Sequence, residues 1–194
     1  MKGLLAEKLV MTQAITQDGS ADAITILKAE PNVITQVKQS DKDGYFALQL
    51  GLPQKMKKRD KAPVMRAKRE FRFPEYAGKP GDQVKVGDVF AVGDRVDVIG
   101  ITKGRGFAGT IKRHHFHRGP MTHGHDHHRA PGSIGAMGIP RVEKGRRMSG
   151  HLGNVQVTIK NLKIMAIDSA TNLLAVSGGI PGAPKQIVMI RKHE

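Results

Sequence analysis

Short apolar and β-branched runs, separated by turn residues, recur along most of the chain. The first three cover residues 23–29, 32–38 and 44–50, with turns at Glu30-Pro31-Asn32 and from Ser40 to Gly44. β-Branched and aromatic residues between Gly, Pro, Asn and Asp clusters are typical of strands. The pattern predicts three successive antiparallel strands.

Further strands are predicted on both sides of a long glycine-rich stretch. They cover residues 83–90, 95–101, 155–159, 162–167, 173–176 and 187–190, with a hairpin connection from Asp168 to Asn172. Helix is scarce, and its best candidate is 63–71, because Pro63 suits a first helical turn. Many short strands favour a small barrel or sandwich. We therefore expect a mainly β fold, with a small barrel or sandwich formed by residues 1–102 and 152–194.

Residues 103–151 lack this pattern. Glycine recurs throughout, Pro120, Pro131 and Pro140 interrupt the segment, and almost no apolar periodicity is left. Such a segment cannot bury enough apolar surface to offset the entropy of ordering it. We expect a long irregular extension inserted between strands and ordered by a partner.

Positive charge is confined to two segments. The net charge is +15; residues 55–72 hold nine Lys or Arg and two acids, and residues 103–151 hold ten and two, so the rest of the chain is neutral. Like charges concentrated in one segment repel one another and cannot be buried unpaired. They therefore indicate a polyanionic partner, that is nucleic acid, and this interpretation is favoured over a tail that only keeps the protein soluble. The first segment lies in a basic, partly helical insertion predicted at about 53–75.

Composition excludes several other classes. The chain has no cysteine, so it forms no disulfide and has no thiolate metal site or thiol nucleophile. Its start does not resemble a signal peptide, and no apolar run approaches the ~18 residues of a membrane span. We expect a cytoplasmic protein that contacts no membrane.

A Gly-x-Gly-x-x-Gly pattern from Gly104 to Gly109 follows a predicted strand. A dinucleotide site would need an amphipathic helix after the glycines and an acid about 20 residues further on. The continuation from Thr110 to His115 is cationic instead, and no kinase catalytic-loop pattern follows. We interpret the glycines as allowing close approach to phosphates that Lys103, Arg105, Lys112 and Arg113 neutralise.

Eight of the nine histidines lie in residues 103–151. The run from His123 to His128 resembles the H-x-H-x-D-H metal motif of metallo-β-lactamases but is one residue short. A metal-dependent hydrolase using His123, His125, Asp126 and His127 therefore stays open as the enzymatic alternative. The competing interpretation is that these imidazoles hydrogen-bond and stack on RNA.

The same segment carries the motifs of a known family. Residues 102–113 resemble the K-G-K/R-G-F-x-G-x-x-K-R segment of the ribosomal protein L-three family, of the universal uL3 type. Matching motifs follow in order at 122–124, 128–135 and 144–153. The ends of the chain match at Met11-Thr12, Asp18-Gly19, 32–38, 43–45, 172–174 and 179–182. This colinear agreement covers nearly the whole chain, and its length resembles the bacterial or organellar type.

The resemblance implies a structural protein without catalytic activity, cofactor or small-molecule substrate. It implies a translation-protein-like barrel, an early role in assembly of the large ribosomal subunit, and neighbouring ribosomal proteins as partners. Residues 103–151 would thread through large-subunit rRNA toward the peptidyl transferase centre. We expect rRNA contacts from Lys103, Arg105, Phe107, Lys112, Arg113, His114, His115, Arg118, His123, His128, Arg129, Ser133, Arg141, Lys144, Arg146, Arg147 and His151.

The tip nearest that centre would be formed by Ile134, Gly135, Ala136, Met137 and Gly138. Many bacterial members of the family have a methylated Gln here, and this chain has none. A general nucleic-acid-binding barrel outside the ribosome is the remaining alternative.

Overall fold

The computed structural model describes residues 3–15, 18–53, 64–72, 78–138 and 140–193. The chain divides into two compact units, one formed by Met1–Thr102 with Gln156–Glu194 and the other by Lys103–Val155. Strands dominate the described residues, which confirms the mainly β class. None of the helices among them is long and apolar enough to span a membrane.

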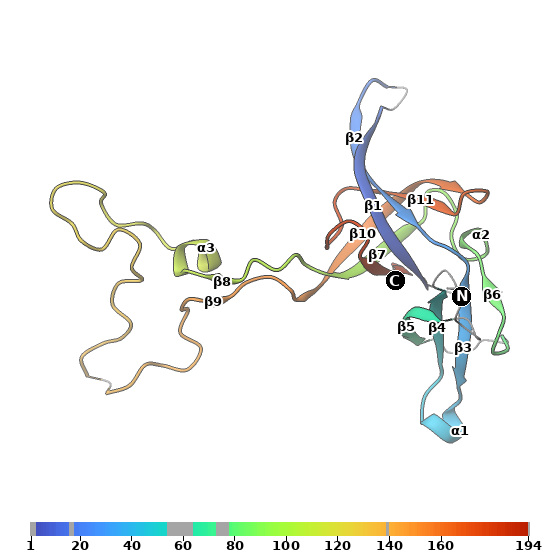
Figure 1. Ribbon diagram of the computed structural model, residues 1–194, viewed down its shortest axis with the longest axis horizontal. Coiled ribbons are helices and arrows are strands. Elements are labelled where there is room, and N and C mark those ends of the chain that lie inside the picture. Colours follow the sequence, from blue (N-terminus) through green and yellow to red (C-terminus); the bar gives the residue numbers. More distant parts are fainter. Residues whose placement is uncertain (1–2, 16–17, 54–63, 73–77, 139, 194) are drawn as a thin grey trace. The chain divides into compact units, whose positions relative to one another are not determined.

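Six strands of the first unit form a closed ring of antiparallel pairs (Figure 1). In order around the ring they are β1 (Gly3–Ile15), β12 (Ile187–Lys192), β7 (Arg95–Ile101), β10 (Gln156–Asp168), β11 (Leu173–Ser177) and β2 (Ala21–Lys28). Predicted strands at 155–159 and 162–167 are thus parts of one strand, β10. The pairing shifts register between Ile159 and Leu162, where the sequence pattern is interrupted.

Alternate residues of the ring strands point inward and are fully buried. On β7, Val96 and Val98 are 0% exposed, as is Ile190 on the neighbouring β12. This period of two is what a sheet with one buried face requires. Because the chain has few aromatic residues, aliphatic side chains fill this core.

A second sheet of the first unit has the order β5-β4-β3-β6. Its strands are β3 (Asn32–Lys38), β4 (Ala47–Pro53), β5 (Met65–Arg72) and β6 (Gln83–Val84), and two one-turn helices, α1 (Ser40–Asp43) and α2 (Val86–Val89), lie nearby in sequence. Ile34, Leu50 and Phe71 of this sheet belong to the same buried cluster as the ring residues. The first unit therefore has one continuous core.

Three predictions for this region are wrong. Residues 65–71 of the predicted helix 63–71 belong to strand β5, because β5 pairs with β4 from Ala47↔Arg72 to Pro53↔Met65. This tertiary pairing overrides local helix propensity. Residues 83–90 form only the two-residue β6 before α2, whose Asp88 carboxylate accepts a hydrogen bond from the Lys85 backbone N–H at 3.2 Å.

The third wrong prediction is the pairing of the first three strands. Strands β2 and β3 follow each other in sequence but lie in different sheets. Residues 54–63, which hold five of the nine Lys and Arg residues of the first basic segment, lie outside the described residues.

Two buried polar side chains hold distant parts of the first unit together. The Asn32 amide accepts from the Leu5 backbone N–H and donates to the Leu5 carbonyl, both at 3.0 Å, and so pairs with β1 as another strand would. The Lys8 ammonium donates to the carbonyls of Ile180 and Gly182 at 2.8 and 3.1 Å. These contacts satisfy backbone groups that would otherwise be buried without partners.

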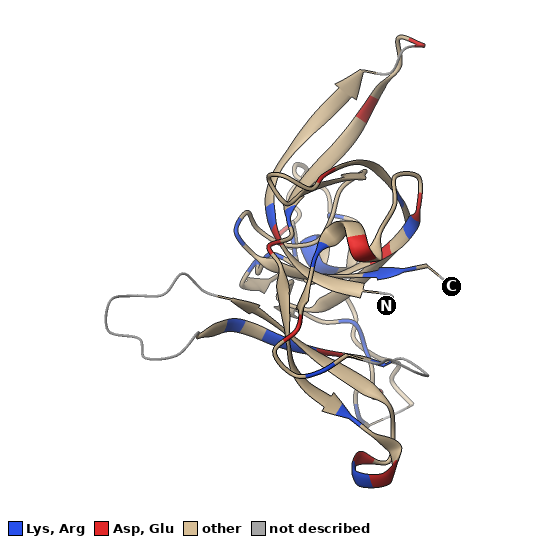
Figure 2. Ribbon diagram, turned by 90° about the vertical axis from the view of Figure 1, so that its right-hand side faces the viewer, with Lys and Arg blue, Asp and Glu red and all other residues tan. Residues whose placement is uncertain are grey.

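The outer half of the β1–β2 hairpin pairs only with itself and extends from the ring (Figure 1). Strand β1 was not among the strands predicted from sequence. The described residues between Lys8 and Lys28 include Asp18 and Asp22 but no Lys or Arg, and Figure 2 shows this arm without blue. The positive charge of the protein lies elsewhere.

Candidate RNA interface

The second unit begins with a short two-stranded ladder. Strand β8 (Phe107–Ala108) pairs with β9 (Gly150–His151). The ladder continues through backbone hydrogen bonds from Arg105 N to Leu152 O at 2.8 Å and from Leu152 N to Gly106 O at 3.0 Å. Gly153, at φ +76°, lies so close to Lys103 that a Cβ there would fall 2.1 Å from the Lys103 carbonyl oxygen. Only glycine fits this approach of the two chains.

A one-turn helix, α3 (Thr110–His114), follows the ladder and is attached to the far end of the segment. The Arg113 guanidinium donates to the Met148 carbonyl at 2.8 Å, and the His114 Nε2 atom lies 3.0 Å from the same oxygen. Arg113 and His114 are accordingly half-buried. Two residues that were predicted to contact RNA therefore also position the basic turn 144–150.

Beyond α3, residues 115–149 contain no helix or strand wherever the structure describes them, whereas β8, α3 and β9 lie within the segment 103–151 that was predicted to be irregular. One loop is closed by the Gly119 N–H, which donates to the His128 carbonyl at 3.3 Å, and by His128 Nδ1, 2.8 Å from the Pro120 carbonyl. Few other contacts hold this loop. Its shape is set by these hydrogen bonds and not by a core.

The predicted tip residues lie in a second loop. The Arg146 guanidinium donates to the Ser133 carbonyl at 2.9 Å, and the Ser133 hydroxyl donates to the Gly135 carbonyl at 2.9 Å. A shallow hollow of about 310 Å³ lies between Ile134, Ala136, Arg141 and Arg146. The Met137 side chain is completely exposed.

The charged groups of the second unit lack acidic partners among the described residues and, apart from the half-buried Arg113, are exposed. Among its described residues no Lys or Arg forms an ion pair. The predicted contact residues that are exposed are Lys103, Arg105, Phe107, Lys112, His115, Arg118, His123, Arg129, Ser133, Arg141, Lys144, Arg146, Arg147 and His151. Arg113, His114 and His128 are half-buried. The Phe107 ring, 73% exposed among these cations, is available to stack on a base.

The enzymatic alternatives gain no support from this geometry. Across the described residues there is no group of three His, Asp or Glu side chains placed to hold a metal ion, although His125 and His127 lie edge to face with ring centroids 6.2 Å apart. The glycines from Gly104 to Gly109 lead into a helix of only five residues, whereas a dinucleotide site has a longer helix whose N-terminus binds the pyrophosphate.

Sequence reasoning missed one cluster of polar residues on the first unit. Asp97 on β7, Arg191 on β12 and His193 after it form a hydrogen-bonded group, with Asp97 only 3% exposed. Burial opposes ionisation of Asp97, but hydrogen bonds from the Asn161 N–H, His193 and Arg191 outweigh it and lower the pKa of the carboxyl. Asp97 lies in the alternating run 95–101, and its partners lie more than 60 residues away in the sequence, so only pairing of the strands reveals the group.

Comparison with known proteins connects both units to one family. The family model described as Ribosomal protein L3 matches residues 75–187. The large ribosomal subunit protein uL3 of Pelotomaculum thermopropionicum is 47% identical over 204 residues, with 98% of this chain and 96% of the relative covered. The proteins of the same name from Alkaliphilus metalliredigens and Carboxydothermus hydrogenoformans are 42% and 44% identical to this chain. In both comparisons 98% of this chain and 97% of the relative are covered. The family resemblance inferred from the motifs is thereby confirmed, and the chain belongs to the ribosomal protein uL3 family.

Proposed function

We propose that this chain binds large-subunit rRNA chiefly through residues 103–151, while the barrel body, 1–102 and 152–194, attaches it to the subunit. As a uL3 protein, the chain is a structural and non-enzymatic constituent of the large ribosomal subunit. Its role in translation is that of a component of this assembly.

The observation that carries the proposal is the unbalanced charge of the second unit. Its ten Lys and Arg side chains have only Asp126 and Glu143 as acidic neighbours in sequence, and no described one is ion-paired. Isolated, these groups repel one another. The phosphates of RNA would neutralise these groups, and the binding would release cations condensed on the RNA.

The shape of the segment supports the same proposal. Loops closed by a few hydrogen bonds expose guanidinium, imidazole and Phe107 side chains, which suit contact with phosphates, folded RNA and unstacked bases. The family resemblance adds that the ring of strands is of the translation-protein type and that the tip, Ile134 to Gly138, points toward the peptidyl transferase centre. An early role in assembly and contacts with neighbouring ribosomal proteins belong to the same proposal.

A salt titration against a large-subunit rRNA fragment tests the charge argument. If ~6 to 10 phosphates are contacted, the affinity should fall by ~10³ to 10⁵ between 50 and 200 mM salt. Replacing Lys144, Arg146 and Arg147 by Gln should reduce the slope, whereas replacing three lysines of the first unit, such as Lys28, Lys42 and Lys79, should change it less. A flat titration with the unaltered chain would disprove the proposal.

Hydrogen exchange tests the threading. Amides at 115–138 and 140–149 should exchange rapidly in the isolated protein, since few of them are hydrogen-bonded, and slowly in the assembled subunit. Rapid exchange that persists in the subunit would contradict threading.

Co-sedimentation with large subunits in high salt distinguishes this role from that of a nucleic-acid-binding barrel outside the ribosome.

A further inference from the structure

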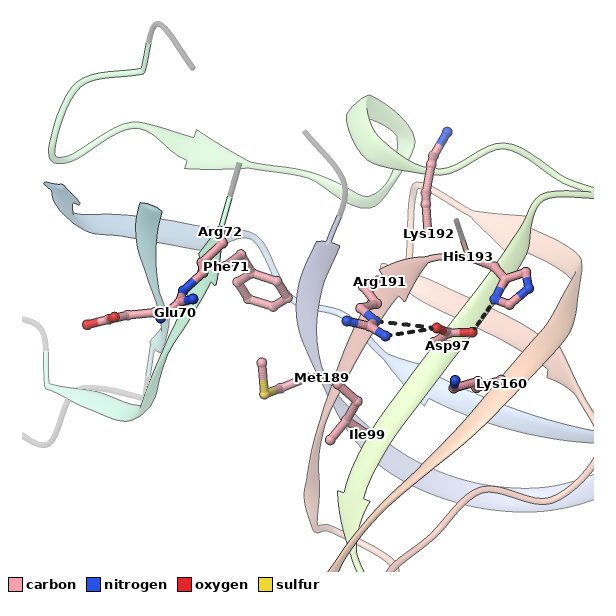
Figure 3. A pocket seen from close by; sticks show the side chains of 10 residues that line it. All are labelled: Glu70, Phe71, Arg72, Asp97, Ile99, Lys160, Met189, Arg191, Lys192 and His193. Atoms are coloured by element: carbon pink, nitrogen blue, oxygen red, sulfur yellow. Dashed lines mark hydrogen bonds and ion pairs between the residues drawn. The ribbon is translucent and has the colours of Figure 1, made fainter. Parts of the chain in front are cut away.

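A recess of about 500 Å³ lies on the first unit (Figure 3). It is lined by residues of β5, β7, β10 and β12 and by His193. Its floor consists of two cross-strand pairs on the outer face of the ring, Asp97↔Arg191 and Ile99↔Met189. Sheet geometry therefore places a polar pair beside an apolar pair.

The Asp97 carboxylate organises the polar half. Its Oδ1 accepts from the Asn161 N–H at 3.1 Å and lies 2.7 Å from His193 Nδ1. Its Oδ2 accepts from Nε and Nη2 of Arg191 at 3.3 and 3.2 Å. With both oxygens engaged, Asp97 has little capacity for a ligand of its own. It is a positioning residue that fixes the directions of the guanidinium and the imidazole.

A bulge in β10 brings a further cation to the same place. The pairing of β10 with β7 shifts register between Ile159 and Leu162, and Asn161 adopts φ +61°. The Arg95 guanidinium donates to the Asn161 side-chain oxygen at 2.8 Å and fixes this turn. The bulge thus directs the Asn161 N–H to Asp97 and places Lys160 on the lining of the recess. Bulges commonly redirect side chains in this way at functional sites.

The polar half of the recess has more hydrogen-bond donors than the Asp97 carboxylate can accept from. Among the contacts of the described residues, Arg191 Nη1, His193 Nε2 and the Lys160 ammonium have no hydrogen-bond or ion-pair partner. Arg191, Lys160 and the His193 imidazole thus lie around the Asp97 carboxylate. The rest of the lining adds Arg72, Glu70, which is paired with Lys38, and Lys192, which is paired with Asp94. A recess with such an excess of donors favours an anion, and guanidinium and ammonium groups bind phosphate well.

The apolar half makes the site larger than an anion alone requires. The Ile99 and Met189 side chains are half-buried, next to Phe71, which is 6% exposed. Together they form an apolar wall beside the cations (Figure 3). A nucleotide has the matching chemistry, with an apolar face on its base and a charged phosphate a few ångströms away.

We propose that this recess binds one unstacked nucleotide of RNA, with its phosphate on Arg191, Lys160 and His193 and its base against Ile99 and Met189. The inference rests on the proposed RNA-binding function but concerns a second contact, on the barrel body. RNA would then be held at two places, through the loops of 103–151 and through a preformed pocket.

The test compares Lys160→Gln with Lys163→Gln in the full chain. Both variants remove one exposed charge from β10, and only Lys160 lines the recess. In salt titrations against large-subunit rRNA, Lys160→Gln should lower the salt slope by about 0.7 to 1, the value of one phosphate contact, and Lys163→Gln should not. Met189→Ala should weaken binding at every salt concentration without changing the slope.

Photocrosslinking with 4-thiouridine-labelled rRNA supplies a second readout. Crosslinks should map to the peptide that contains Met189 or to that containing Lys160. The inference would be overturned by equal slopes for the two lysine variants or by the absence of a crosslink at either peptide. It would also be overturned if an acidic side chain of a neighbouring protein occupied the recess in the assembled subunit. If the unaltered chain did not bind rRNA, the proposed function itself would fail. If variants at Lys144, Arg146 and Arg147 reduced the slope while Lys160→Gln did not, only the pocket would be refuted.

Discussion

The guanidinium of Arg113 donates a hydrogen bond to the carbonyl oxygen of Met148, 35 residues further along the chain, at 2.8 Å. Gly150 lies directly beside it, because a Cβ there would be 2.7 Å from Arg113 Nη1. Arg113 thus stabilises the fold of its own segment, 103–151. Neighbouring cations such as Arg105 are exposed and face solvent.

Arg113→Gln and Arg105→Gln should therefore differ although each removes one charge. In the complex with rRNA, Arg113→Gln should speed amide exchange around α3 and at 147–151, because the hydrogen bond to Met148 is lost. Arg105→Gln should reduce the salt slope by about 1 and leave exchange there unchanged. Hydrogen–deuterium exchange with mass spectrometry measures the first effect. Identical exchange in the two variants would contradict a positioning role for Arg113.

Gly153→Ala should disrupt the base of the second unit. An alanine there needs φ +76° and places its Cβ against the Lys103 carbonyl, so the ladder through Arg105 and Leu152 has to open. Gly109→Ala is the matched control, since no atom lies within 4 Å of its Cβ position and its φ is −68°. Exchange at Arg105 and Leu152 should rise in the first variant alone. Unchanged protection in Gly153→Ala would show that the ladder tolerates a side chain.

Asn32→Ala should lower the free energy of unfolding by about 2 to 4 kcal/mol, since the buried N–H and carbonyl of Leu5 lose their partner. Urea denaturation followed by circular dichroism measures this loss. Thr12→Ala, on the exposed arm of β1, should stay within about 0.5 kcal/mol of the unaltered chain. Equal stabilities of the two variants would mean that the Asn32 amide does not bridge β1.

Asp97 should make stability depend on pH in the acid range. Since its pKa is lowered in the folded state, its stabilising effect is fully present above the ordinary carboxyl value of about 3.9 and is lost as the pH falls through the lower folded value. Asp97→Asn should be less stable than the unaltered chain at pH 7 and should lose less stability between pH 5 and 2. Thermal unfolding across this range tests it, with Asp22→Asn on the exposed arm as control. A parallel decline of Asp97→Asn and the unaltered chain would refute the assignment.

Most strands could be predicted from sequence because alternation and turn residues are local signals. Asn32–Lys38 and Arg95–Ile101 were predicted with the bounds that the structure has, and the ends of β11 and β12 differ from the predicted ones by no more than two residues. Strand β5 could not be predicted, because its exposed and charged residues resemble a helix until β4 pairs with them. The recess was missed for the same reason, since Asp97, Lys160 and Arg191 meet only when β7, β10 and β12 are adjacent.

The sequence by itself determined the segregation of charge, the absence of a core in residues 103–151 and the β character of the rest. Each of these follows from local composition, which sets how much apolar surface a segment can bury and which backbone conformations it prefers. Tertiary structure alone decided the ring order of the strands, the bridges made by Asn32 and Lys8, and the inward attachment of Arg113. These depend on contacts between residues far apart in the chain, whose geometry exists only once the strands have paired.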